Sequence, residues 1–500
     1  MNHHRIKKIV IVGGGTAGWM SAAALSQLLP KNYEYRLVES DQISTIGVGE
    51  ATIPSIRNFN MHLGIDEAEF LSATQATFKL GIEFVNWGRE NTRYFHGFGA
   101  VGRDQSTANF FHYWLRLQQL GMVGDLDPYS INTVASQDSK FSLGRPDLPN
   151  SPLADLSYAY HFDAGLYAKF LRSYAEKRGV MRTEGRIVQT LLRETDGFIE
   201  ALVMENGEKI EADFFIDCSG MVGLLIEKAL NTGYENWTHW LPCDTAIAVP
   251  CELGGSTQAH TRSTAHAAGW QWRIPLQHRI GNGHVFSSQF MQQEQAQNIL
   301  MKNLDGKALA EPRTLQFTTG KRKKAWNKNC IAIGLSGGFM EPLESTSIHM
   351  VKTGLMRLIS FFPDRDFDQV DIDHYNRLTD KEYAQIRDFL ILHYKINSRG
   401  DSEFWKYCRD MSVPDSLQGK IELFASHGRI LRENEELFPE DSWLQVMIGQ
   451  GLQPRRYNPV VDQRSLEEIA GFLDNTQRVI RKCVDAMPSH AEFVKSYCAK

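Results

Sequence analysis

The stretch IVIVGGGTAGWMSAAAL, residues 9–25, decides the fold of this 500-residue chain. Its first four residues are β-branched and apolar, as in a buried parallel strand, and an apolar helical segment follows the glycines. Residues 13–18, GGGTAG, fit the G-x-G-x-x-G pattern in the required strand–turn–helix context. We expect Gly13 to permit the tight turn, Gly15 to let the backbone approach a pyrophosphate, and Gly18 to let helix and strand pack closely. The stretch therefore predicts a dinucleotide-binding βαβ unit.

The second predicted strand, YEYRLVES at 33–40, ends beside an acidic residue. Glu39 follows Gly18 by twenty-one residues, where a carboxylate would hold the ribose hydroxyls of a dinucleotide. Because a carboxylate would repel a 2′-phosphate, FAD or NAD is favoured over NADP. Thr16 and Ala17 open the helix, whose N-terminus faces the phosphates with a partial positive charge. The competing interpretation is a glycine-rich turn that binds nothing.

A second formal match to the glycine pattern occurs at 97–102, GFGAVG. It follows TRYFH, which is not an apolar strand, and precedes RDQSTANFFH, which is not an amphipathic helix. We therefore expect a single dinucleotide fold and no second domain for a nicotinamide donor.

The composition is that of an ordinary soluble globular protein, with 42% hydrophobic and 23% charged residues. A net charge of −5 argues against nucleic acid or an anionic membrane as the main partner, and the run KRKK at 321–324 is interpreted as a solvated face. Seven cysteines without a C-x-x-C pair favour reduced thiols over disulfides or a zinc site. No segment approaches the roughly 20 apolar residues of a membrane span. We expect a soluble, cytoplasmic protein without a metal.

Further strands are expected between about 155 and 360, at 199–204, 214–220, 245–250 and 330–334, and from about 361 onward helical spacing dominates. The coarse prediction is an α/β core with a helical C-terminal part.

The stretch GWQWRIP at 269–275 predicts a strand with an aromatic face. Alternation places Trp270, Trp272 and Ile274 on one face and the two polar residues on the other, and Pro275 ends the ladder. Packing of two buried indoles would by itself explain this stretch.

Several of these motifs together resemble one enzyme family. The sequence resembles the flavin-dependent halogenases of the tryptophan-halogenase type across nearly the whole chain. GGGTAGW at 13–19 is similar to their FAD fingerprint, FKLGIEF at 78–84 to the segment of their catalytic lysine, GWQWRIP to their W-x-W-x-I-P signature, and EPLESTSIH at 341–349 to their flavin- and halide-binding segment. The first motif is shared by many flavoproteins, whereas the other three together are specific.

The resemblance implies a Rossmann-like FAD-binding monooxygenase core (1–110 and 155–360) and a mostly helical substrate-side subdomain (111–154 and 361–500), in an α/β, overall α+β, fold. It implies that FADH2 from a separate NADH-dependent flavin reductase reacts with O2, and that a halide ion, bromide or chloride, becomes hypohalous acid. This acid then halogenates a small aromatic substrate in a separate pocket. The bulk of Trp270 and Trp272 would keep that substrate away from the flavin. A homodimer is compatible with the resemblance.

Lys79 and Glu344 match the catalytic lysine and glutamate of that family. Lys79 would either hydrogen-bond to hypohalous acid or be halogenated by it, and these roles need different protonation states. Burial lowers the pKa of a lysine and a nearby carboxylate raises it, so we favour a charged Lys79 that activates the electrophile. Glu344 would stabilise the arenium cation and help to remove its proton. Taken without the family, Lys79 is an exposed strand lysine and Glu344 a loop carboxylate.

The remaining site residues are also implied by the resemblance. Cofactor contacts fall on Val188, Leu335 and Ile348 in addition to Gly13, Gly15, Thr16, Ala17, Gly18 and Glu39; halide contacts fall on Thr346 and Ser347; substrate contacts fall on His96, Phe98 and Trp443.

The sequence departs from the free-tryptophan members of the family at its C-terminal segment. Trp443 and Leu444 stand where those members carry two tyrosines that bind the amino-acid carboxylate, Ser347 where many carry glycine, and His349 where they carry tyrosine. An unpaired carboxylate in such a pocket would be costly, so an indole or another electron-rich arene is favoured, with bromide preferred over chloride.

Two alternatives stay open at this point. The first is a flavin-dependent aromatic hydroxylase on the same scaffold, which the lack of a G-D motif at 334–337 disfavours. The second is a non-catalytic nucleotide-binding protein, for which Lys79→Ala would change only stability.

Overall fold

The structure, a computed structural model, describes residues 4–42, 49–255, 257–433 and 435–499. The chain packs into two compact units: unit 1 comprises Met1–Ala76, Phe162–Asp244 and Gln316–Ala384, and unit 2 comprises Thr77–His161, Thr245–Leu315 and Gln385–Lys500. These borders follow packing and differ from the predicted ones, because residues 245–315 belong to unit 2. The functional division into flavin core and substrate side stays a prediction.

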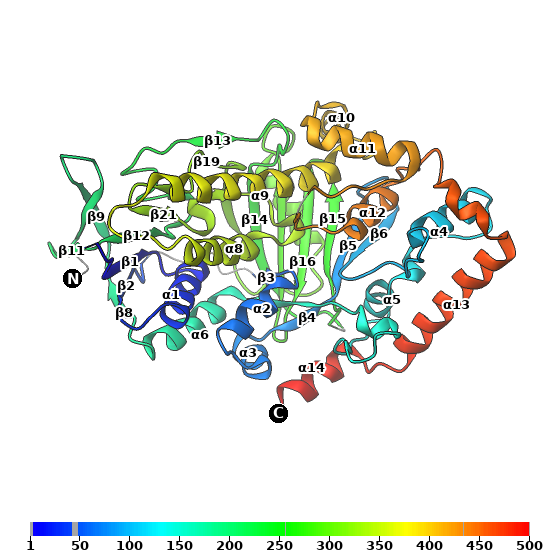
Figure 1. The fold of residues 1–500 in the computed structure, drawn as a ribbon, viewed down its shortest axis with the longest axis horizontal. Helices are drawn as coiled ribbons and strands as arrows, with labels where there is room; N and C mark the ends of the chain where they lie inside the picture. Colours follow the sequence, from blue (N-terminus) through cyan, green and yellow to red (C-terminus); the bar gives the residue numbers. More distant parts are fainter. Residues whose placement is uncertain (1–3, 43–48, 256, 434, 500) are drawn as a thin grey trace. The chain divides into compact units, whose positions relative to one another are not determined.

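A six-stranded sheet forms the centre of unit 1 (Figure 1). Its order is β20 (Trp326–Asn327), β21 (Cys330–Ala332), β12 (Phe214–Asp217), β1 (Lys8–Val12), β2 (Glu34–Glu39) and β8 (Met181–Glu184), and all neighbours except β20 and β21 are parallel. The last four residues of β1 are buried, as a central parallel strand requires. Helix α1 (Thr16–Leu28) packs on α6 (Ala164–Glu176) and α8 (Ser347–Ser360). The predicted βαβ unit is confirmed.

Smaller elements complete unit 1. An antiparallel sheet contains β9 (Ile187–Leu192), β10 (Ile199–Met204) and β11 (Lys209–Glu211), and a second one contains β13 (Tyr234–Asn236), β19 (Gly320–Arg322) and β22 (Gly338–Phe339). Helices α2 (Ser55–His62) and α3 (Glu67–Thr74) also belong to this unit.

Unit 2 is built around a seven-stranded sheet. Its order is β18 (Arg313–Gln316), β14 (Thr245–Cys251), β17 (Ile280–Phe286), β16 (Gly269–Pro275), β15 (Thr261–His266), β5 (Gly81–Val85) and β6 (Arg93–Gly97). Strand β5, blue in Figure 1, thus pairs with the green strand β15, which lies far away in the sequence, and β6 pairs with β5 at the edge of the sheet. The predicted tryptophan strand is confirmed with the boundaries 269–275, and all seven of its residues are buried, the polar ones included.

Helices dominate the C-terminal part, as predicted. They are α9 (Gln369–Lys395), α10 (Glu403–Asp410), α11 (Asp415–His427), α12 (Glu440–Gly449), α13 (Leu466–Asp485) and α14 (His490–Cys498). Helix α13 packs on α4 (Phe110–Gln119) and α5 (Ile131–Gln137), and both α13 and α14 begin with a capping box.

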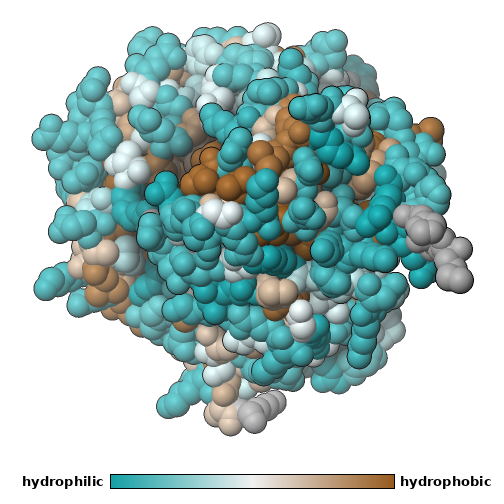
Figure 2. Space-filling model, turned by 90° about the vertical axis from the view of Figure 1, so that its left-hand side faces the viewer, coloured by the Kyte–Doolittle hydropathy of each residue, from teal (hydrophilic) through white to brown (hydrophobic). Residues whose placement is uncertain are grey.

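The surface agrees with the composition. The face in Figure 2 is largely hydrophilic, with apolar residues gathered near its centre. Among the described residues, no helix is long and apolar enough to cross a membrane. All seven cysteines are free thiols.

Candidate active site

The glycine turn after β1 leaves no space for side chains. Gly13 has a φ of +112°, and a Cβ there would lie 2.3 Å from the carbonyl oxygen of Cys218. A Cβ on Gly18 would lie 1.8 Å from the carbonyl oxygen of Gly13, so the first turn of α1 rests directly on the loop. Gly15 is the N-cap of α1, where backbone N–H groups are free to meet an anion. This cradle fits the pyrophosphate of a dinucleotide.

Glu39 lies beside the same turn. A Cβ on Gly14 would lie 1.4 Å from its carboxylate, whose side chain is 14% exposed. Arg182 Nε donates to Glu39 Oε1 at 2.5 Å, and Arg172 approaches to 3.7 Å. The carboxylate is therefore held at the end of β2 by two arginines, where the sequence predicts a ribose contact.

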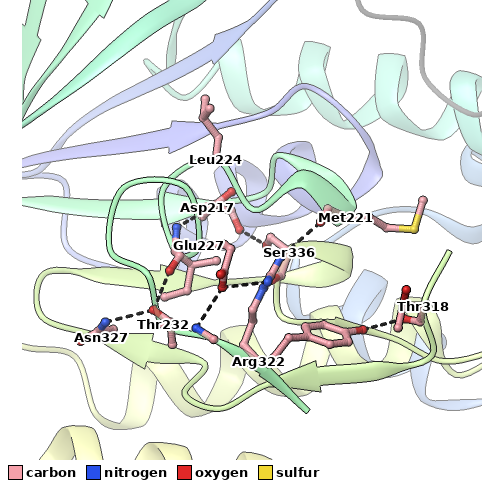
Figure 3. Close-up of polar contacts among 12 residues, drawn as sticks. Asp217, Met221, Leu224, Glu227, Thr232, Thr318, Arg322, Asn327 and Ser336 are labelled. Carbon is pink, nitrogen blue, oxygen red and sulfur yellow. Dashed lines mark hydrogen bonds and ion pairs between the residues drawn. The ribbon is translucent and has the colours of Figure 1, made fainter. Parts of the chain in front are cut away.

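A buried network supports the turn Gly334–Ser336, which carries the predicted flavin contact Leu335 (Figure 3). Asp217, at the end of β12, is fully buried and accepts the backbone N–H groups of Ser219, Leu225 and Ile226 at 2.8–2.9 Å. Its backbone oxygen accepts a hydrogen bond from Ser336 Oγ. The carboxylate thus fixes the loop after β12, and the hydroxyl ties the turn 334–336 to the same strand.

Arg322 continues this network and corrects a prediction. Its guanidinium donates to Ser336 O at 3.0 Å, Glu227 Oε2 at 2.9 Å and Met221 O at 3.2 Å, and it is 7% exposed. Lys321 is also buried and lies 2.7 Å from Asp380. The interpretation of KRKK as a solvated face is therefore wrong for its first two residues, because carboxylates and carbonyls from distant segments surround them.

Glu344 and the predicted halide residues lie at the beginning of α8. Glu344 is fully buried in the short 3-10 turn Pro342–Glu344, so it is not a solvated loop carboxylate. Thr346 is the N-cap of α8 and Ser347 is its first residue, which places their backbone N–H groups at the positive end of a 14-residue helix. An anion is stabilised at such a position.

The other predicted flavin contacts of unit 1 differ in exposure. Ile348 is buried in the first turn of α8, and Leu335 is half-buried in the 3-10 turn Gly334–Ser336. Val188 is 63% exposed on β9, a strand of a different sheet from the glycine cradle. The backbone N–H of Gly185, three residues earlier, donates to Glu39 O at 2.9 Å, so this hairpin begins beside the end of β2, and the Val188 contact stays a prediction.

His349 forms a polar chain that the sequence does not reveal. Its Nδ1 lies 2.8 Å from Ser55 Oγ, and its Nε2 lies 3.2 Å from Glu382 Oε1. Arg357 donates to the other oxygen of Glu382 at 2.7 Å. Burial raises the pKa of Glu382, but the hydrogen bonds and charges of His349 and Arg357 outweigh it and lower that pKa. The chain fixes the first turn of α8 from two further helices.

Lys79 ends the short strand β4 (Thr77–Lys79) in unit 2. It is fully buried and pairs with Ala159 of β7 (Ala159–Asp163), so the alternative interpretation of Lys79 as an exposed strand lysine is wrong. Its Nζ lies 5.2 Å from the ring centre of Phe98, within cation–π range. Two residues that the sequence singles out separately are thus neighbours.

Aromatic residues surround His96 and Trp443. The ring of Phe389 lies 5.6 Å from that of His96 and 4.9 Å from that of Trp443, and it stacks on Phe438 at 3.8 Å. Sequence analysis missed both phenylalanines, since nothing in the helical pattern marks them. Trp443 Nε1 is buried and has no hydrogen-bond partner among the described residues.

Gln445 holds this group together. From α12 its Oε1 accepts the N–H of Gly97 at 3.0 Å, and its Nε2 donates to the carbonyl of the same residue at 3.2 Å. The clamp fixes α12, and with it Trp443, against β6, which carries His96.

The tryptophans of β16 pack as predicted. Trp270 lies 6.3 Å from Trp87 and 6.2 Å from Trp272 between ring centres, and Trp272 faces Gly283 across the sheet. A Cβ on Gly283 would lie 2.1 Å from the indole, so glycine makes room for it. Pro275 ends the strand, opposite Ile280.

Fold and cradle together define a dinucleotide-binding protein of the Rossmann class. The model of the tryptophan halogenase family matches residues 8–465, and the chain belongs to this family. It is 47% identical to Xcc4156, a flavin-dependent halogenase from Xanthomonas campestris, with a TM-score of 0.95 over 99% of both chains. BrvH, a flavin-dependent halogenase from Brevundimonas sp. BAL3, gives 45% identity and a TM-score of 0.95 over 99% of both chains. Tryptophan 6-halogenase ThaL from Streptomyces albogriseolus is 32% identical over 98% of each chain.

The family fixes the class of reaction. The chain is a flavin-dependent halogenase, an oxidoreductase that uses FADH2, halide and O2, and the hydroxylase alternative is not favoured. Enzymes of this family act on an aromatic substrate and receive reduced flavin from a separate reductase.

Proposed function

We propose that this enzyme halogenates an indole-type arene other than free tryptophan, with Lys79 and Glu344 as its catalytic residues. The observation that carries the proposal is that both ionisable side chains are fully buried, Lys79 beside Phe98 and Glu344 next to the N-terminus of α8. Buried ionisable groups are costly, and they concentrate where chemistry needs them.

FAD would bind at the glycine cradle. The contacts come from the backbone of Gly13, Gly15, Thr16, Ala17 and Gly18, from Glu39, and from Val188, Leu335 and Ile348. When bound and reduced, FAD reacts with O2 and supplies the oxidising equivalents that turn halide into hypohalous acid. The backbone N–H groups of Thr346 and Ser347 would hold the halide and replace part of its hydration.

Lys79 Nζ donates a hydrogen bond to the oxygen of hypohalous acid and makes the halogen more electrophilic. The arene carbon then attacks the halogen, so that a carbon–halogen bond forms while the halogen–oxygen bond breaks. The Glu344 carboxylate stabilises the arenium cation and takes its ring proton. The leaving hydroxide takes the proton that Lys79 Nζ donates and departs as water, the proton on Glu344 passes to solvent, and Lys79 regains one from solvent. The sum is arene plus hypohalous acid giving haloarene plus water.

The residues around Trp443 support a substrate without an amino-acid carboxylate. Trp443 and Leu444 are buried and offer one indole N–H between them. Lys420 Nζ, 5.0 Å above the Trp443 ring, is already paired with Glu436 at 2.9 Å. His96, Phe98 and Trp443 would hold a flat apolar ring system instead, and bromide would be preferred over chloride.

Trp270 and Trp272 would act by bulk alone. As a barrier they would let halide, but not the arene, be oxidised. Replacing both with leucine tests this: the barrier hypothesis predicts some oxygenated arene product with FAD still bound, and a product pattern identical to wild type would contradict it.

The partner would be an NADH-dependent flavin reductase. Seven free thiols support a cytoplasmic location, and a homodimer stays part of the proposal.

One incubation tests the function as a whole. The enzyme, FAD, a flavin reductase, NADH and O2 are mixed with bromide or chloride and a panel of indoles that includes free tryptophan. Mass spectrometry should find brominated indoles, weaker chlorination and little halotryptophan. Halotryptophan as the main product would contradict the substrate proposal, and a halide-independent gain of one oxygen would contradict halogenation.

A further inference from the structure

The face of the seven-stranded sheet opposite Trp270 and Trp272 carries a polar cavity of its own. The cavity measures about 380 Å³, and Glu83, Arg93, His260, Arg262, Gln271 and Arg273 are among its lining residues. Alternation along β16 puts Gln271 and Arg273 on this face and the indoles on the other. No residue assigned to flavin, halide or arene lines the cavity.

Two arginines face each other across the strands of this cavity. Arg262 of β15 is directly opposite Arg273 of β16, and Glu83 of β5 is the next residue in the same row. Like charges in directly opposed positions destabilise a sheet unless something lies between them. The row therefore requires a compensating negative charge.

The carboxylates on this face compensate the positive charge of the arginines only incompletely. Asp305 Oδ2 lies 2.6 Å from Arg273, but its other oxygen reaches Arg262 only at 3.6 Å. Glu83 lies 3.2 Å from Arg93 and 3.6 Å from His260. Three guanidinium groups thus share two carboxylates. Burial and the charge of Arg273 lower the pKa of Arg262, as expected for a cation with too little countercharge.

A buried histidine also lines the cavity. His260 is 4% exposed, and its Nε2 makes no hydrogen bond within the described part of the chain; Glu83 Oε2 lies 3.6 Å from it. Arg262 is about one-third exposed and Arg93 is 74% exposed, so solvent reaches the cavity along these two side chains. Basic side chains therefore line the buried part of the cavity, and its other side is open to solvent.

We propose that this cavity binds an oxyanion, a phosphate or a carboxylate group, between the guanidinium groups of Arg262 and Arg93, with His260 as a further donor. Planar guanidinium groups match the paired oxygens of either group. The mainly polar lining suits a small hydrophilic molecule, and the site is separate from the halogenation chemistry, so the inference does not depend on the proposed function.

Calorimetric titration of the full-length enzyme tests the site. The protein is saturated with FAD, so that the pyrophosphate cradle is filled, and is titrated with inorganic phosphate and with citrate at constant ionic strength in sodium chloride. We expect saturable binding of at least one probe. Phosphate binding without citrate binding identifies a phosphate site, the reverse identifies a carboxylate site, and absence of both overturns the proposal.

Three variants make the test specific. Arg262→Gln, or Arg93→Gln should the first variant fail to fold, should raise the Kd by about tenfold or more, since a charge-assisted hydrogen bond is lost. Arg478→Gln removes an exposed arginine on α13 that pairs with Asp474 at 2.9 Å and does not line the cavity, so it should leave the Kd unchanged. Equal binding by wild type and the cavity variants would overturn the proposal.

Discussion

Variants of Lys79 and Glu344 show whether these two buried side chains serve catalysis or only stability. Lys79→Met keeps the shape of the buried lysine stem and removes its charge, so the cost of holding that charge away from water disappears together with its contacts. We expect this variant to fold and bind FAD like wild type, while halogenation falls by about 10²–10⁴. Steady-state rates and FAD fluorescence titration check both parts. Full halogenation by Lys79→Met would remove the lysine from the mechanism.

Glu344→Gln keeps the volume and loses the proton acceptor. We expect kcat to fall by about 10²–10⁴ while the KM for the indole changes little, because the glutamate acts after the arene is bound. Formation of hypohalous acid without haloarene would identify the affected step, and mass spectrometry of the products checks it. A change in KM alone would instead make Glu344 a binding residue.

The predicted cofactor site requires that position 18 carries no side chain. In Gly18→Ala the new methyl group meets the carbonyl oxygen of Gly13, which must move and distort the cradle. We expect FAD binding to weaken by at least about tenfold, together with a lower Tm. Gly419 lies in α11 with nothing within 4 Å, so Gly419→Ala is a matched control. It should leave FAD binding unchanged and stabilise the protein by about 0.5–1 kcal/mol. Unchanged FAD affinity in Gly18→Ala would contradict the assigned site.

At the scale of elements, α12 carries a titrating group beside the predicted substrate residues. Burial, followed by the negative charge of Asp104, raises the pKa of Asp441 from 3.8 to about 7. A raised pKa in the folded state means that the contribution of Asp441 to stability is complete below pH 4. It is lost as the pH rises toward 7, because the folded protein must then hold a poorly solvated charge.

Asp441→Asn tests this pH dependence. The amide oxygen can still accept a hydrogen bond, but the charge is gone. We expect the variant to be more stable than wild type at pH 8 by on the order of 2 kcal/mol. The loss of a favourable contact between the carboxylate and the helix dipole reduces this gain. Near pH 4 the gain should disappear, because Asp441 is then protonated in the folded protein and holds no buried charge. Urea unfolding at both pH values measures the difference. Asp474→Asn, at an exposed carboxylate on α13, should show no such change with pH. A constant difference between Asp441→Asn and wild type would refute the raised pKa.

Local patterns predicted individual elements well, and assembly of the whole molecule less so. The strand before Gly13, the helix after it and the tryptophan strand follow from neighbouring residues, so the sequence predicts them with nearly correct boundaries. The burial of Arg322 and the Ser55–His349–Glu382 chain could not be predicted, because their partners come from distant segments. The same holds for Phe389 beside Trp443. Long-range pairing leaves no periodicity in a single sequence.

The division of the molecule into two units allows a test that does not use catalysis. All predicted FAD contacts belong to unit 1, whereas α13 belongs to unit 2. FAD at 100 times its Kd stabilises the bound state by about 2.7 kcal/mol. Hydrogen exchange should therefore slow most in peptides covering residues 9–20 and 334–349, whose amides surround the cradle and begin α8, and least in residues 466–485. Gly18→Ala at the same FAD concentration should lose this protection. Equal protection of α13 and of residues 9–20 would mean that FAD binds elsewhere or that the two units open only together.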